Sequence, residues 1–239
     1  MYFSSFYYDI DPQSVDINRN IKLPQLLSLL LNTAGRSSEE YHIGVDQLID
    51  EGKAWVLSRI AIETKRLPRH NERIRIDTWI EKVERMFSLR NFQIVSDGDI
   101  VGEARSVFAV IDIGTRRPVN LMEEERFARL STGSPVSIEA PCKISPVTEE
   151  AAFRYRTLYS DIDFNGHCNS ARYIEWMLNA LPIEKAKLLD AKRLDINYMH
   201  EVMPGDEISI AHADDDTSLT FDVKNSQGTS VARALIIKR

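Results

Sequence analysis

The sequence predicts an α+β protein built from two copies of one unit, each a long apolar helix packed on an antiparallel sheet. Three observations support this prediction. Short alternating stretches between turn residues indicate antiparallel strands, two apolar stretches have helical spacing, and the same order of elements occurs twice.

The composition is that of a globular protein with an acidic balance. The chain has 239 residues, 43% of them hydrophobic, and its 30 Lys and Arg against 36 Asp and Glu give a net charge of -6. This balance argues against a nucleic-acid partner, which is bound through basic surfaces. The sequence has neither a basic, apolar leader nor an apolar run long enough for a membrane span, so a cytoplasmic protein is expected.

The cysteines and histidines give no sign of a metal site. Cys142 and Cys168 have neither zinc-ligand nor disulfide-framework spacing, and the five histidines lack metal-ligand spacing. We therefore expect no metal and no cofactor.

The first unit, residues 1–130, begins with a strand and continues with a helix. The helix at residues 23–34 carries apolar side chains around its whole circumference, so we expect it to be buried on all sides. A short helix at residues 46–51 ends before Gly52, and the Ser-Asp-Gly-Asp turn at residues 96–99 predicts a hairpin. The predicted strands cover residues 3–8, 54–64, 73–80, 87–95 and 100–113.

Residues 131–150 are rich in Ser, Thr and Pro and have no sustained periodicity, which predicts a linker. The second unit, residues 151–239, then repeats the order of the first. Its apolar helix at residues 170–181 is also expected to be buried all round. The predicted strands of this unit cover residues 153–159, 194–199, 207–212, 219–224 and 230–238.

The duplication can be followed residue by residue. A shift of 147 positions matches Asp-x-Asn-x-His at residues 163–167 with Asp-x-Asn-x-Asn at residues 16–20. A shift of 136 positions aligns the later strands and places Glu201 on Lys65. Because the first unit lacks both the histidine and the glutamate, we expect one catalytic set per chain, with the first unit as scaffold or pocket.

Polar side chains gather just before the second apolar helix. Every second position there is polar: Asp161, Asp163, Asn165, His167 and Asn169. Free backbone N–H groups and the helix dipole at a helix N-terminus favour a carbonyl oxygen or an anion. This arrangement suggests chemistry on an acyl group.

Two apolar helices, each wrapped by an antiparallel sheet, resemble a double hotdog fold. Residues 160–176 are similar to the D-x-N-x-H-x-N-x-x-Y-x-x-W segment of the acyl-acyl carrier protein thioesterases of plastids and bacteria. Further similarities follow in the family's order: WVLSR at residues 55–59, Thr78 and Trp79, residues 106–110, and TRRP at residues 115–118. The resemblance implies a thioesterase of fatty acid biosynthesis that releases free fatty acids from its partner, acyl carrier protein.

The active residues of that family are the Asp, Asn and His of this segment and a Glu on a following strand. By position, the resemblance implies catalytic roles for Asp163, Asn165, His167 and Glu201. Plant-type members typically have a cysteine after the Glu, and here that position is Val202, so no cysteine mechanism operates at that point.

Thioester hydrolysis needs a positioned water, a proton acceptor and donors for the oxyanion. We expect His167 and Glu201 to activate the water jointly; which of them accepts the proton first stays open, as does a covalent carboxylate route. Asn165 is expected to orient the water or the carbonyl. The backbone N–H groups around Asn169 and Ser170, which are also expected to cap the helix, are expected to complete the oxyanion site.

Two interpretations of Asp163 stay open: it holds the Asn or His side chain, or it only caps the loop as an Asx-turn. Cys168 follows His167, but adjacent side chains in an extended loop point apart, so we expect a small buried filler and not a nucleophile. The default interpretation of Arg116 and Arg117 is that they lie in a turn and are exposed to solvent.

Other functions share some of these features. An acyl-CoA thioesterase would use the same chemistry and stays open. A hydratase or dehydratase of the same fold would resemble a different motif around its histidine. A non-catalytic protein that binds acyl chains or their carrier is disfavoured by the complete Asp-x-Asn-x-His motif with Glu201.

The acyl tunnel and the oligomeric state are less defined by the sequence. Trp55, Trp79 and Phe108, with the first apolar helix, are candidates to line a tunnel, although ordinary core positions are the plainer interpretation. Monomer and homodimer both stay open, because two units in one chain can pair with each other.

Overall fold

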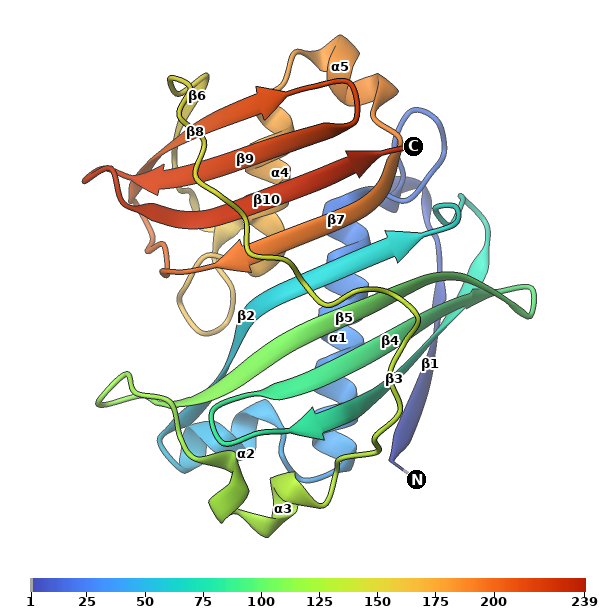
Figure 1. Cartoon of the computed structure of the whole chain (residues 1–239), viewed down its shortest axis with the longest axis vertical. Helices are drawn as coiled ribbons and strands as arrows, with labels where there is room; N and C mark the ends of the chain where they lie inside the picture. Colours follow the sequence, from blue (N-terminus) through green and yellow to red (C-terminus); the bar gives the residue numbers. More distant parts are fainter. Residues whose placement is uncertain (1) are drawn as a thin grey trace.

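Ten strands form one continuous antiparallel sheet that runs through both halves of the chain (Figure 1). The computed structural model describes residues 2–239. The strand order is β1-β3-β4-β5-β2-β7-β10-β9-β8-β6, so the strands of each predicted unit stay together in their own half of the sheet. This arrangement agrees with the predicted α+β repeat.

The predicted strands and helices are present, and most of their boundaries shift by only a few residues. The first half contains β1 (Phe3–Asp9), η1 (Pro12–Ser14), α1 (Leu23–Glu40), α2 (Val45–Asp50), β2 (Lys53–Thr64), β3 (Arg73–Val83), β4 (Ser88–Ser96), β5 (Asp99–Asp112), η2 (Leu121–Glu123) and α3 (Glu125–Ala128). The second half contains β6 (Phe153–Arg156), η3 (Tyr159–Asp161), α4 (Ser170–Asn179), α5 (Ile183–Leu188), β7 (Ala191–Tyr198), β8 (Glu207–Asp214), β9 (Ser218–Asn225) and β10 (Ser230–Lys238). The short helices α3 and α5 and the three 3-10 turns were not predicted.

The two halves meet where β2 pairs with β7. Ile60 lies opposite Ile196 in this register, and both side chains are fully buried. The sequence shift of 136 positions places these two residues on each other, so an approximate two-fold axis passes between them. The two units are thus joined edge to edge through equivalent strands.

The turn that leads into each long helix is also duplicated. The isolated bridges Val15–Ile21 and Ile162–Cys168 close the two turns at equivalent positions. Inside each bridge, the N–H of an aspartate donates to the carbonyl four residues later at 2.8 Å. The polar motif of the second unit therefore lies on a backbone that the first unit reproduces.

Helices α1 and α4 contact each other on one face of the sheet (Figure 1). Their predicted burial on all sides is wrong. Helix α1 exposes a stripe made by Gln25, Asn32, Arg36 and Glu39. In α4, Asn179 is exposed, and Arg172 and Glu175 are only partly buried. Because the helices form a single layer over the sheet, one side of each packs and the other meets solvent.

Residues 131–150, here called the strap, cross the opposite face of the sheet without forming a helix or strand (Figure 1). Buried side chains of the sheet hold it: Asp195 Oδ1 accepts the N–H of Cys142 at 2.9 Å, and Asn197 Oδ1 accepts that of Ile144 at 3.1 Å. The strap buries the side chains of Val136, Ile144 and Val147. The N–H of Ser137 also donates to Glu103 Oε2 of β5 at 3.1 Å, so this predicted linker is fixed to both halves of the sheet.

One cluster of buried apolar side chains spans the two units. It includes Leu27 and Leu30 of α1, Ile174 and Met177 of α4, and residues of most strands. Among residues 2–239, no helix combines the length and apolar character needed to cross a membrane.

Candidate active site

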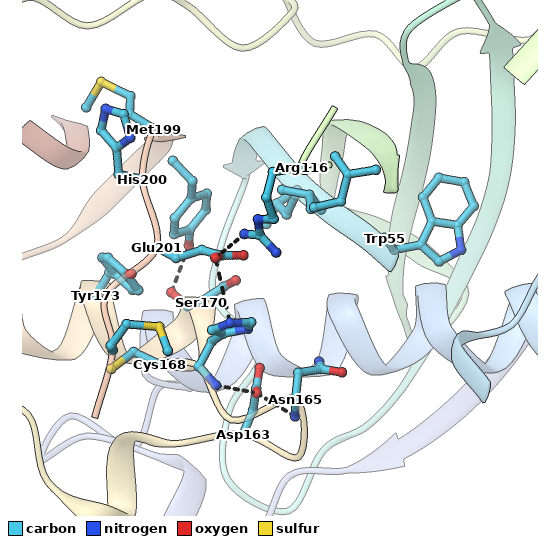
Figure 2. Close-up of a pocket in the computed structure, with 16 residues that line it drawn as sticks. Trp55, Arg116, Asp163, Asn165, Cys168, Ser170, Tyr173, Met199, His200 and Glu201 are labelled. Carbon is cyan, nitrogen blue, oxygen red and sulfur yellow. Dashed lines mark hydrogen bonds and ion pairs between the residues drawn. The ribbon is translucent and has the colours of Figure 1, made fainter. Parts of the chain in front are cut away.

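The predicted catalytic segment forms a tight turn between η3 and α4. Asp163 Oδ1 accepts the backbone N–H of Asn165 at 2.9 Å and that of His167 at 3.4 Å (Figure 2). Gly166 has a φ of 78°, a left-handed conformation that glycine adopts without strain. These bonds give Asp163 the Asx-type capping geometry, and no side-chain bond from it to Asn165 or His167 is present.

Asp161, which precedes this turn, is fixed by hydrogen bonds on the buried side of the chain. Its buried carboxylate accepts the Tyr155 hydroxyl at 2.9 Å and Trp176 Nε1 at 3.2 Å, and it also accepts the N–H of Leu158 at 2.7 Å. The bond to Leu158 helps to fold the chain into η3, so β6 ends earlier than predicted. The alternation of polar residues indicated Asp161 only as a member of the polar cluster. The local sequence does not tell whether an aspartate side chain points into the core or toward solvent.

The two residues predicted for the oxyanion site have different positions. Asn169 is the N-cap of α4, since its side chain accepts the N–H of Ala171 at 2.9 Å. Its own N–H donates to the carbonyl of Asp161 at 2.8 Å, so the prediction that this group faces an oxyanion is wrong. Ser170 is the first residue of the helix and lines the cavity described below.

One backbone hydrogen bond brings the histidine and the glutamate together. The N–H of Cys168 donates to the carbonyl of Val202 at 3.1 Å, and these residues directly follow His167 and Glu201. His167 Nε2 consequently lies 3.6 Å from Glu201 Oε2, although 34 positions separate the two residues in the sequence. Both side chains are about one-third exposed.

Arg116 also contacts Glu201, through an ion pair from the loop that follows β5 (Figure 2). Burial raises the pKa of Glu201, but the hydrogen bond from Arg116 and the charges of His167 and Arg116 outweigh burial and hold it below its ordinary value. Arg116 is exposed, as expected for the predicted solvated turn, but the sequence interpretation did not include its contact with Glu201. The Thr-Arg-Arg-Pro similarity indicated this segment, but no local pattern pairs an arginine with a carboxylate 85 residues away.

Cys168 has the properties of a packing residue. Its side chain is buried, and burial raises the pKa of the Cys168 thiol to about 11. A thiol with this pKa stays protonated near neutral pH and is a poor nucleophile. The expected role as a small buried filler agrees with this environment.

An open cavity of about 580 Å³ contains the His167 and Glu201 side chains, and both units line it (Figure 2). Its first-unit residues are Trp55, Val56, Leu57, Ile111 and Arg116. Its second-unit residues are Asp163, Asn165, His167, Cys168, Ser170, Tyr173, Tyr198, Met199, His200, Glu201 and Met203. The structure thus brings together all four predicted catalytic residues.

A second cavity of about 190 Å³ adjoins the first and continues along α1. Both cavities share Trp55, Leu57, Asp163, Asn165 and Ser170 as lining residues. Phe108 also lines the second cavity, whereas Trp79 is buried against Phe3 and donates to the carbonyl of Ser134. Of the three aromatic residues proposed for a tunnel, two lie at this cavity.

Two helix-and-sheet units are joined in one sheet, and within residues 2–239 one His–Glu pair lines a cavity between them. These features define a double hotdog protein with one candidate active site. A family model described as the acyl-ACP thioesterase N-terminal domain matches residues 3–128, and one described as the acyl-ACP thioesterase C-terminal domain matches residues 144–237. The chain belongs to the acyl-ACP thioesterase family, which confirms the resemblance seen in the sequence.

Individual relatives agree with this assignment. The chain is 22% identical over 229 residues to an oleoyl-acyl carrier protein thioesterase of Coriandrum sativum, covering 86% of this chain and 62% of the relative. It is 24% identical over 181 residues to an acyl-[acyl-carrier-protein] hydrolase of Cuphea viscosissima, covering 72% of this chain and 43% of the relative. The chain therefore spans about half the length of these plant proteins.

Solved structures confirm the double hotdog fold. An acyl-ACP thioesterase from Bacteroides thetaiotaomicron superposes with a TM-score of 0.93 at 32% identity, covering 100% of this chain and 98% of the other. The 12:0-ACP thioesterase from Umbellularia californica superposes with a TM-score of 0.88, with the same coverage of both chains. Its 16% identity supports the fold alone.

Proposed function

We propose that this chain hydrolyses the thioester between a fatty acyl group and acyl carrier protein and releases the free fatty acid. The observation that supports this most directly is the His167–Glu201 pair, 3.6 Å apart, in a cavity that shares lining residues with a second cavity along α1. A thioester bound there would have its carbonyl carbon beside the pair and its acyl chain in the cavity along α1. Family membership supports the same substrate class.

In the proposed reaction, His167 and Glu201 act together on one water molecule. The water oxygen attacks the thioester carbon while its proton passes to the pair, which gives a tetrahedral intermediate with a negative oxygen. When the carbon–sulfur bond breaks, the carrier thiolate leaves and takes up a proton from the pair. The products are a fatty acid and the free thiol, with no proton left on the enzyme pair.

Asn165 and Ser170 are the candidates to stabilise the negative oxygen. Both line the two cavities beside the His–Glu pair. The Asn165 amide supplies N–H donors, and the N–H of Ser170 belongs to the first turn of α4, where the helix dipole favours negative charge. Asp163 contributes by fixing the turn that carries Asn165 and His167.

The first unit is proposed to shape the acyl cavity without supplying acid–base chemistry. Asn20 and Lys65 occupy the positions of His167 and Glu201 in the sequence alignment of the two units. Helix α1 and strands β2, β4 and β5 nevertheless provide most of the wall of the second cavity.

The proposal is tested by the hydrolysis of acyl carrier protein thioesters from short to long chains, with coenzyme A thioesters measured in parallel. The His167→Ala and Glu201→Gln variants should each lose about 10² to 10⁴ in kcat/KM, because general acid–base catalysis contributes roughly this much. Asn20→Ala is the matched control, since it changes the equivalent turn position in the unit without the pair.

Hydrolysis of carrier thioesters by the wild type, with losses confined to the two site variants, supports the proposal. Faster turnover of the coenzyme A thioesters would move the assignment to an acyl-CoA thioesterase. Binding of acyl carrier protein with no hydrolysis of any thioester would overturn the enzymatic function and leave a binding protein.

A further inference from the structure

An open groove lies beside the catalytic turn, next to the two cavities of the candidate site. It has a volume of about 740 Å³ and is formed by residues in and around η3, by the catalytic turn and by the loop that follows Glu201. Asp163 lines both this groove and the first cavity, and Met203 of the first cavity is followed directly by Pro204 of the groove. The groove therefore borders the cavity that contains the His–Glu pair.

Large apolar side chains of this groove are exposed to solvent. Leu158 is 55% exposed, Phe164 77% and Tyr159 96%. One exposed apolar residue needs no explanation, because folded proteins leave much apolar surface in contact with water. Three of them on one groove are typical of a surface that binds another molecule.

Two exposed arginines of β6 adjoin the groove. Arg156 Nε donates at 3.3 Å to the carbonyl of Gly205, which lines the groove, and Arg154 lies on the same face of the strand. Both arginines line a polar pocket together with Glu207, which lies opposite Arg156 in the register of β6 and β8. Within residues 2–239, no carboxylate forms an ion pair with either arginine. Their charges are thus available to an anionic partner.

The first unit forms the same backbone without this surface. The shift of 147 positions places β6 on the second half of β1 and η3 on η1, and the bounds of the two 3-10 turns coincide. At the groove positions the first unit has Tyr7 for Arg154, Asp9 for Arg156, Asp11 for Leu158, Pro12 for Tyr159 and Ile17 for Phe164. Because the first unit folds with these residues, the backbone does not require the arginines, the leucine or the tyrosine. The surface distinguishes the unit that carries the His–Glu pair.

The occupant that fits this surface is the protein that carries the acyl thioester. Such a carrier has to bring its thioester to the His167–Glu201 pair, so it must contact the enzyme beside the first cavity, where the groove lies. Exposed apolar side chains next to arginines match a partner face of apolar and acidic side chains. Since the whole chain has a net charge of -6, a local basic surface would also orient an acidic carrier toward this side.

We propose that Leu158, Tyr159 and Phe164, with Arg154 and Arg156, form the docking surface for acyl carrier protein. The arginines bind acidic side chains of the carrier, and the apolar residues pack against apolar side chains of its docking face. This inference rests on the proposed thioesterase function and names the surface that binds the partner of the same site.

The charges are tested with the double variant Arg154→Glu and Arg156→Glu. Its KM for an acyl carrier protein thioester should rise about tenfold or more with kcat unchanged, because repulsion replaces attraction at the docking surface. Its kinetics with the acyl-N-acetylcysteamine thioester of the same chain should equal those of the wild type, because this small neutral substrate makes no contact with the arginines. Added salt should raise the KM for the carrier thioester in the wild type and not in the variant.

The double variant Lys65→Glu and Arg69→Glu is the matched control. It changes the net charge by the same amount on the loop of the first unit that aligns with residues 201–205, where both side chains are exposed. Its kinetics with both substrates should equal those of the wild type. An equal rise of KM in both double variants would show that the overall charge, and not a docking surface, controls binding of the carrier.

The apolar part of the surface is tested with Tyr159→Ala, whose melting temperature checks the fold. Its KM for the carrier thioester should rise about fivefold or more, as is typical of an aromatic residue removed from a protein–protein interface. Leu188→Ala is the control, because Leu188 is 83% exposed and lines neither the groove nor the first cavity. If sedimentation shows a wild-type dimer that Tyr159→Ala dissociates, the groove joins two copies of this chain and the carrier proposal is wrong.

The two proposals fail in different ways. If thioesters are hydrolysed but the arginine double variant keeps the wild-type KM for the carrier, or loses activity on both substrates alike, the docking surface is wrong while the thioesterase function stands. If no thioester is hydrolysed, the function is wrong, and docking is then measured by calorimetry with acyl carrier protein. No binding, or equal affinities of the wild type and the arginine double variant, would overturn the inference.

Discussion

Glu201 lies between an imidazole and a guanidinium in the lining of the first cavity. His167 contributes the imidazole at 3.6 Å, and Arg116 reaches the same carboxylate oxygen from the other unit. Arg116 can influence catalysis without contacting the substrate. Its hydrogen bond lowers the pKa of Glu201, whereas burial raises it. We regard it as a positioning residue.

Arg116→Met should move the acid limb of the pH profile to higher pH. Without Arg116, the burial of Glu201 still raises its pKa while the largest opposing interaction is lost. The carboxylate would then be protonated, and activity lost, at a higher pH as the solution is acidified. The measurement is kcat/KM for an acyl carrier protein thioester as a function of pH.

Arg117→Met provides the control for this prediction, since Arg117 is the exposed neighbour of Arg116. Its acid limb should coincide with that of the wild type. An unchanged acid limb in Arg116→Met would show that Arg116 does not control Glu201.

At the scale of elements, the protein uses one turn twice and carries a histidine in only one copy. Asp16 accepts the N–H groups of Asn18 and Asn20 at 2.8 and 2.9 Å, as Asp163 does for the turn before α4. The backbone geometry is therefore required in both units to start the helix. The histidine occurs only in the copy that lies beside Glu201.

Asp16→Ala and Asp163→Ala should have similar effects on stability and different effects on activity. Each variant loses two hydrogen bonds to backbone N–H groups, and we expect each to lose about 1 kcal/mol in the free energy of unfolding. Only Asp163→Ala should also lower kcat, because only that turn carries Asn165 and His167. Urea unfolding and thioester hydrolysis measure the two effects, and an equal loss of kcat in both variants would contradict the comparison.

The whole molecule is expected to unfold as one cooperative unit. A single sheet continues across the β2–β7 pair, and one buried cluster contains side chains from both units. The strap adds hydrogen bonds to Asp195 and Asn197 from the opposite face. Separating the units would expose two strand edges and divide this core.

The three tryptophans allow this to be measured. Trp55 and Trp79 report on the first unit, and Trp176 reports on the second. In urea, fluorescence of the Trp176→Phe variant and of a double variant with Trp55→Phe and Trp79→Phe should each coincide with its own circular dichroism transition. A fluorescence midpoint that departs from the circular dichroism midpoint in either variant would show that the units unfold separately.

The sequence alone determined the strands, the two long helices, their repetition and the polar turn. These features depend on short-range physics: side chains alternate across a strand, recur along a helix face, and bond to backbone groups a few residues away. The resemblance of the sequence to the acyl-acyl carrier protein thioesterases also placed Asp163, Asn165, His167 and Glu201 in one proposed site. The structure gathers these four residues at one cavity, and their catalytic roles stay predictions.

Only the tertiary structure decided which faces meet. It showed that α1 and α4 each keep a solvent-exposed side, that the strap is fixed to the sheet, and that the N–H of Asn169 is already bonded. It also brought Arg116 to Glu201 and placed the buried Arg90 in the lining of a cavity. The physical reason is that such contacts join residues far apart in the chain, and their partners are set by how the layers pack and not by any local pattern.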